Sequence, residues 1–242
     1  MLTALSVIAK VVTFVVEKAA PKLAALPFDK RRKACRALTK LYFSVQALHE
    51  STSYVLETFD DFRYRGDGEG LFNALNNHSR DIELASNMFI QLSFELENGL
   101  EVIDPALAKC CHLLYWGKFD FLSYLSDSIG SDRSGPTPRK IIKRPRGRMM
   151  EVDYEDLYKQ SQRGLDAKEP HFWPSSALDD FTAEFEDVPI TFEDNETAGE
   201  IHGMIVAQHE RLRFAMDQLR SLIKSSFNIE EVLFLSDKHP WR

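Results

Sequence analysis

A sustained heptad pattern between residues 29 and 63 limits the fold of this chain more strongly than any other feature. Its polar member is Thr52, and its apolar members alternate steps of four and three residues: Ala34, Leu38, Leu41, Val45, Leu48, Val55, Phe59 and Phe62. This spacing places side chains in one stripe along an α-helix. Asp29 stands where an N-cap is expected, and the glycines of residues 66–70 end the pattern. We therefore predict a helix over 29–63.

Three further segments carry the same spacing and predict helices over 70–98, 104–129 and 197–226. The first of these has His78 in its apolar stripe, and Gly99 follows it in the place of a C-cap. The second begins with Asp104 and Pro105, the usual order for an N-cap and a first helical residue. The stripe of the last helix is expected to be Ile201, Ile205, Gln208, Leu212, Ala215, Leu219 and Leu222.

The first segment predicts a helix over 2–20 that is apolar except for one narrow stripe. The stripe consists of Thr3, Ser6, Lys10, Thr13 and Glu17. A helix this apolar is usually enclosed by its neighbours. Pro21 and Pro27 are expected to end it. The apolar run is too short for a membrane span of about 20 residues and lacks the basic start of a secretory signal. The three cysteines are too few for a disulfide framework, which fits a reducing setting, so we expect a cytoplasmic protein.

Charge is divided sharply in the middle of the chain. Residues 134–150 contain three prolines, no acid and six basic residues: Arg139, Lys140, Lys143, Arg144, Arg146 and Arg148. Residues 151–200 contain fifteen acids and three bases. Because prolines favour an extended chain and acidic residues follow directly, we interpret the basic stretch as a tether that meets acidic protein surface. A second partner-binding set is expected among the aromatic residues that follow: Phe172, Trp173, Phe181 and Phe185.

These patterns predict an all-α protein. Residues 1–130 are expected to form an elongated antiparallel four-helix bundle, and 131–196 an irregular surface arm. The arm is expected to hold a short helix that ends at Gly164 and an extended piece within 187–194. Residues 197–242 supply a long C-terminal helix and tail that pack on the bundle or on a partner.

No constellation of an enzyme or a cofactor site is evident in the sequence. His49 and His209 each precede a glutamate but lack the second histidine of a zinc motif. Cys110 and Cys111 are expected to pack in a helix rather than to act as nucleophiles. We therefore expect neither a metal nor a cofactor. His78 is the candidate for a pH-sensitive core residue.

The leading functional hypothesis is a non-enzymatic interaction or scaffold subunit of a larger protein assembly. Its expected partners are other protein subunits, including a second copy of the chain. One alternative is a membrane-disrupting effector, because an apolar first helix at the start of a helical bundle is similar to the architecture of some cell-death proteins. The other alternative is a factor that binds nucleic acid or anionic lipid through residues 134–150, although the net charge of −7 disfavours binding of polyanions by the chain as a whole.

Overall fold

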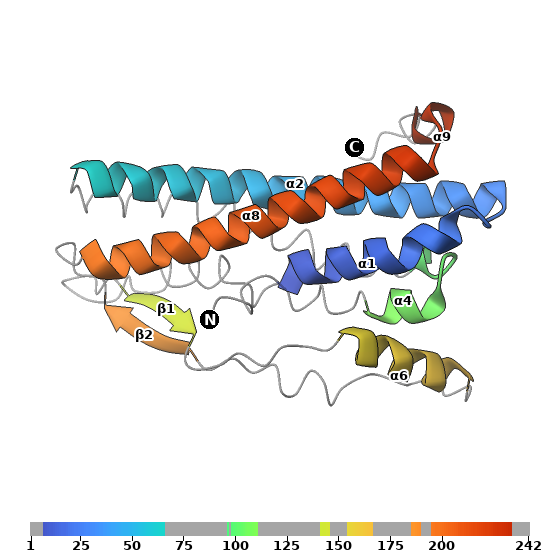
Figure 1. The fold of residues 1–242 in the computed structure, drawn as a ribbon, viewed down its shortest axis with the longest axis horizontal. Helices are drawn as coiled ribbons and strands as arrows, with labels where there is room; N and C mark the ends of the chain where they lie inside the picture. Colours follow the sequence, from blue (N-terminus) through green and yellow to red (C-terminus); the bar gives the residue numbers. More distant parts are fainter. Residues whose placement is uncertain are drawn as a thin grey trace.

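Three long helices lie side by side in the computed structural model of the chain (Figure 1). The structure describes residues 7–65, 96, 98–110, 141–145, 154–166, 185–189 and 195–233. Helix α2 (Phe28–Arg65) and helix α8 (Asn195–Ser226) run antiparallel, and α1 (Val7–Leu23) lies against α8 and runs in the same direction as it. The all-α class predicted from the heptad patterns is confirmed.

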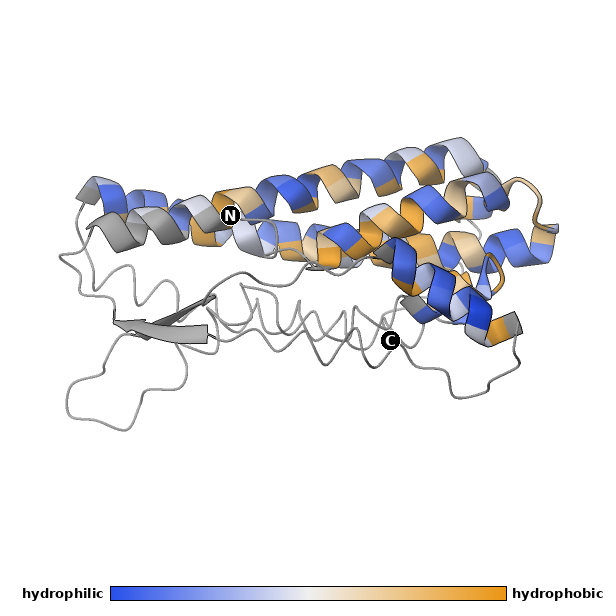
Figure 2. Ribbon diagram, turned by 60° about the horizontal axis from the view of Figure 1, so that its bottom comes forward, coloured by the Kyte–Doolittle hydropathy of each residue, from blue (hydrophilic) through white to orange (hydrophobic). Residues whose placement is uncertain are grey.

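The buried stripes of α2 and α8 are those that the spacing predicts. All nine predicted members of the α2 stripe are at most 2% exposed, and Ile205, Gln208, Leu212, Ala215 and Leu219 of α8 are 0% exposed. The polar member Thr52 donates a hydrogen bond from Oγ1 to the Leu48 carbonyl at 2.7 Å, so its hydroxyl is satisfied within its own helix. Figure 2 shows hydrophobic and hydrophilic residues alternating along the long helices, as this arrangement requires.

Helix α1 is enclosed as expected, but Pro21 does not end it. Ile8, Val11, Val12 and Val15 are 0% exposed. The helix continues through Pro21 to Leu23, which is 1% exposed. A proline inside a helix loses its N–H bond and crowds the carbonyl four residues earlier, but Pro21 is only two residues from the end of α1, so little helix follows it. None of the helices in the described part of the chain is long and apolar enough to cross a bilayer.

The two predicted N-caps have different outcomes. The prediction for Asp29 is wrong, because α2 begins at Phe28 and the Pro27 carbonyl accepts the N–H of Arg31 at 2.9 Å. Asp29 lies instead in the first turn, where its charge complements the helix dipole. The prediction for Asp104 is confirmed. Its Oδ1 accepts the N–H of Ala106 at 2.9 Å, at the start of α4 (Pro105–Cys110).

The end of the third predicted helix packs directly on α2. Residues 98–100 are helical, and Leu96 and Leu100 are 0% exposed. Gly99 lies within this helical turn rather than after it, so its predicted C-cap role is wrong. A Cβ at position 99 would lie 2.4 Å from Cβ of Ala37 in α2. Glycine is needed here for a close approach of two helices. The remainder of the third helix and residues 111–129 of the fourth lie outside the described residues.

The arm contains the two short elements expected from sequence. Helix α6 (Tyr154–Asp166) packs against α4, and it extends two residues beyond the predicted end at Gly164. Strand β2 (Phe185–Pro189) overlaps the predicted extended piece. It pairs antiparallel with β1 (Ile141–Pro145), so a stretch predicted only as an extended tether is part of a two-stranded ribbon.

The short helix α9 (Ile229–Leu233) is fastened to the beginning of α2. Asn228 and Glu231 form a capping box, in which each side chain accepts the backbone N–H of the other residue, at 2.7 and 2.9 Å. Arg31 donates from Nε to Oε1 of Glu231 at 2.9 Å, and Glu231 is only 3% exposed. Arg31, in the first turn of α2, therefore ties helix α9 to the beginning of α2.

Candidate interaction groove

An open groove lies between α1 and α8. It has a volume of about 510 Å³. Residues from about two turns of α1 and about one turn of α8 line it: Ala9, Lys10, Thr13, Phe14 and Glu17 from α1, and Glu210, Arg211 and Phe214 from α8. Spacings of three and four residues place each set on one face of its helix. Because α1 and α8 pack side by side, these two faces lie next to each other and form the two walls of the groove.

The groove combines an apolar floor with an exposed aromatic wall. Phe14 is 7% exposed and belongs to the core, whereas Phe214 is 59% exposed. Phe214 lies between Leu212 and Ala215 in sequence, both of which are 0% exposed, so it points away from the core face of α8. Singly exposed aromatic rings are normal on protein surfaces, and what makes Phe214 a candidate anchor is its position beside an apolar groove.

Arg211 is the most unusual charged residue of the groove. It is half-buried, its Nη1 atom is removed from solvent, and this atom has no hydrogen-bond partner among the described residues. The neighbouring Glu210 is engaged by Arg213 instead. Buried donors normally find an acceptor, so an unpaired guanidinium nitrogen requires an explanation.

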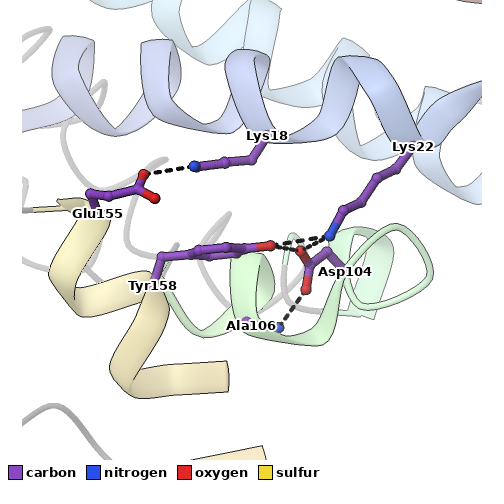
Figure 3. Close-up of polar contacts among 6 residues, drawn as sticks. All are labelled: Lys18, Lys22, Asp104, Ala106, Glu155 and Tyr158. Atoms are coloured by element: carbon purple, nitrogen blue, oxygen red, sulfur yellow. Dashed lines mark hydrogen bonds and ion pairs between the residues drawn. The ribbon is translucent and has the colours of Figure 1, made fainter. Parts of the chain in front are cut away.

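A second polar cluster joins α1, α4 and α6 (Figure 3). Lys22 of α1 donates to Oδ2 of Asp104 and to the hydroxyl of Tyr158, the latter at 3.1 Å, and the Tyr158 hydroxyl donates to the same Asp104 oxygen. Lys18 forms an ion pair with Glu155 at 2.6 Å and lies over the Tyr158 ring. The arm helix α6 is thereby fixed to the bundle.

The cluster shifts the pKa values of its three members away from neutrality. Burial alone would raise the pKa of Asp104, but the bonds from Lys22, Tyr158 and the Ala106 N–H outweigh it and lower that pKa. Burial, together with the bond to Asp104, raises the pKa of Tyr158. Burial alone would lower the pKa of Lys22, but the hydrogen bonds to Asp104 and Tyr158 outweigh it and raise that pKa. All three shifts move the pKa values away from the neutral range in which a general acid or base works best.

Two histidines stack at the interface of α2 and α8. The rings of His49 and His209 have centroids 4.1 Å apart and an interplanar angle of 25°. Nε2 of His209 lies 3.0 Å from Oγ of Ser53, and Nε2 of His49 is buried with no hydrogen-bond partner among the described residues. Burial lowers the pKa of both rings, and their proximity lowers that of His49 further. Other nearby charges act on the pair in both directions: Glu50, Glu210, Arg213 and Asp217.

We expect acidification to destabilise the fold through this pair. Each folded pKa lies below the unfolded value of 6.5, so the unfolded state binds more protons as the pH falls. The contribution of the pair is fully present above about pH 7. It is lost as the pH drops through the unfolded pKa toward the folded one. Urea unfolding between about pH 7.5 and 5 measures this loss. His49→Gln together with His209→Gln should flatten the slope, and an unchanged slope would contradict the assignment.

The buried thiol of Cys35 is not a reactive group. Burial raises the pKa of Cys35 to about 11, which leaves almost no thiolate at neutral pH. The described residues also contain no group of three or more side chains that could hold a metal ion. Cys110 contributes its backbone to α4, and Cys111 lies outside the described residues.

The basic residues predicted from sequence are only partly described. Lys143 and Arg144 belong to β1, where the register places them opposite Asp187 and Glu186 of β2. The ribbon therefore aligns two members of the basic stretch with two members of the acidic segment of the same chain. The other four basic residues lie outside the described part: Arg139, Lys140, Arg146 and Arg148.

Of the predicted aromatic set and the predicted pH-sensitive histidine, only Phe185 belongs to the described residues. Phe185 is opposite Pro145 in the ribbon. Phe172, Trp173, Phe181 and His78 lie outside the described residues. The histidines that the structure does bring together, His49 and His209, were considered in the sequence only as zinc ligands.

No family model matches this chain, and neither the curated proteins nor the solved structures contain a significant match to it. Its function must therefore be argued from its own geometry. The groove was not predicted as a site, but its signal was present in the sequence. Lys10, Thr13 and Glu17 of the groove belong to the narrow polar stripe of the first helix.

Proposed function

We propose that this chain is a non-enzymatic interaction subunit, a scaffold or adaptor, that receives a helical segment of a partner protein in the groove between α1 and α8. The observation that carries the proposal is the exposed Phe214 ring beside an open, apolar-floored groove. Amphipathic helices commonly bind in this way, with apolar anchors laid into a groove between helices. Aromatic side chains at the centre of such a surface supply much of the binding energy.

The shape of the groove supports a partner helix over a small-molecule ligand. A small-molecule site usually encloses most of its ligand, whereas this groove is open along its length. Its α1 wall extends from Ala9 to Glu17, about 12 Å at the helical rise, which matches roughly two turns of a partner helix.

The alternative functions remain predictions. The membrane hypothesis requires α1 to leave the protein, and residues such as Ile8, Val11 and Val12 would then give up their burial in the core. The nucleic-acid hypothesis requires the basic stretch to be free of acidic neighbours, and the ribbon register aligns Lys143 and Arg144 with acidic residues. The groove, by contrast, is open in the described part of the structure.

Replacing the exposed ring should remove partner capture without unfolding the protein. We expect Phe214→Ser to weaken capture of the native partner about tenfold or more, the effect typical of an interfacial aromatic anchor. Affinity purification at native expression, with quantification of the co-purified proteins, measures this loss. Phe43→Ser is the matched control, because Phe43 is equally an exposed aromatic, at 55%, but lies on α2 away from the groove residues. If Phe214→Ser captured the partner as well as Phe43→Ser does, the groove would be rejected as the binding surface.

A further inference from the structure

We infer that the partner helix carries a carboxylate that pairs with Arg211. This inference rests on the proposed function and specifies the chemistry of the occupant. The groove is mostly apolar, and its one buried polar atom without a partner among the described residues is Nη1 of Arg211. A guanidinium remains charged at all physiological pH values and binds carboxylates with two parallel hydrogen bonds.

Four charged residues line the groove: Lys10, Glu17, Glu210 and Arg211. Arg211 forms no ion pair among the described contacts. Glu210 precedes it in α8, but its carboxylate is bound by Arg213. Glu17 lines the groove from α1 and is exposed, and no ion pair joins it to Arg211 among the described contacts. Lys10 is a second cation of the groove lining, so the comparison of Arg211→Met with wild type is what assigns an acidic residue of the partner to Arg211.

The apolar residues then determine how the acid is presented. Phe14 forms part of the floor and Phe214 the wall, and Arg211 lies one helical turn before Phe214 on the same face of α8. A helix with apolar residues at positions i, i+3 or i+4, and i+7 would contact these rings. An aspartate or glutamate beside that stripe, about one turn from its central anchor, would reach Arg211.

A displayed library of amphipathic helical peptides about 20 residues long tests the inference. The apolar stripe is kept constant, the flanking positions are varied, and selection is made on the immobilised full-length chain. We expect the selected peptides to be enriched in Asp or Glu at one flanking position. Their binding should be lost in Phe214→Ser and retained in Phe43→Ser, which assigns it to the groove.

A double-mutant cycle then isolates the charge pair. We expect Arg211→Met, which keeps the length of the stem, to weaken an acidic peptide about tenfold. The same peptide with Gln in place of its acid should bind wild type and Arg211→Met equally. Arg211→Lys should retain part of the acid preference, and a thermal unfolding curve for each variant checks that the fold is unchanged.

Five results would overturn the inference. Groove-binding peptides without acidic enrichment, or equal effects of the Gln exchange on wild type and Arg211→Met, would reject the Arg211 pair but leave the proposed function intact. Enrichment of basic residues would assign the selection to Glu17. Absence of any peptide sensitive to Phe214→Ser would reject the inference together with the proposed function, and a wild-type dimer that Phe214→Ser dissociates would assign the groove to a second copy of the chain.

Discussion

Asp104→Ala should destabilise the protein by about 3 kcal/mol, because one carboxylate serves three neighbours. Loss of the cap on α4 costs roughly 1 kcal/mol. The buried Tyr158 hydroxyl, left without its acceptor, adds about 1–3 kcal/mol. The Lys22 side chain is 40% exposed and can turn toward water, so its lost ion pair adds no more than about 1 kcal/mol. Urea unfolding at neutral pH measures the total.

Two matched variants separate the contribution of the cap from that of the Tyr158 hydrogen bond. Asp104→Asn keeps one oxygen, which can cap α4 in place of Oδ1, but its NH2 group replaces the Oδ2 atom that accepts from Tyr158 and Lys22. It should therefore cost less than Asp104→Ala by the value of the cap alone, roughly 1 kcal/mol. Tyr158→Phe removes only the hydroxyl and should cost about 1 kcal/mol. A value for Asp104→Ala within about 0.5 kcal/mol of wild type, the size of an ordinary surface substitution, would mean that the cluster does not hold α1, α4 and α6 together.

The same carboxylate should contribute to acid denaturation. Its folded pKa is lowered, so its stabilising contribution is present above the unfolded value of 3.8 and is lost as the pH falls through the folded pKa. In Asp104→Ala this part of the acid-induced loss should be absent. Glu231, whose pKa is lowered chiefly by Arg31, contributes in the same direction.

Gly99→Ala should destabilise the protein by about 1–3 kcal/mol, the usual range for overpacking. The added Cβ would lie 2.4 Å from Cβ of Ala37, and the backbone of α2 lies directly behind it. The two helices would therefore have to separate. Thermal and urea unfolding measure the loss.

The chain provides an internal control of opposite sign. Gly203 lies in α8, and a Cβ added there would have no atom within 4 Å, so Gly203→Ala should stabilise by about 0.5–1 kcal/mol through helix propensity. Ala37→Gly should restore space and rescue Gly99→Ala, so that the double variant is more stable than Gly99→Ala alone. Destabilisation by both glycine substitutions, without rescue, would contradict the close helix contact.

The stripes of the long helices could be predicted from sequence because they depend on local periodicity. Leu41 of α2 and Leu212 of α8 are both predicted members, and both are 0% exposed. Their spacing alone identifies the face that a neighbouring helix must cover.

Features that depend on distant neighbours could not be predicted in this way. Helix α1 continues past Pro21 to Leu23, which packs in the core, and Gly99 is needed because Ala37 of another helix approaches it. The Lys22–Asp104–Tyr158 cluster joins residues 136 positions apart. No spacing rule within one segment contains that information.

The candidate groove was partly visible in the sequence. The polar stripe of the first helix predicts a face turned away from the core, and Lys10, Thr13 and Glu17 line the groove. The wall that α8 contributes could not be predicted from the sequence. Phe214 lies outside the α8 stripe by its spacing, but only the pairing of α1 with α8 brings it beside that polar face.

Site-specific photo-crosslinking tests the central claim, that a partner binds between α1 and α8, most directly. The photoreactive phenylalanine analogue p-benzoylphenylalanine would replace Phe214 in one chain and Phe43 in another, each expressed at native level and irradiated. We expect one partner, through one helical segment, to crosslink from position 214 and not from position 43. Crosslinking of that partner from position 43 alone, or from neither position while it still co-purifies, would contradict the account.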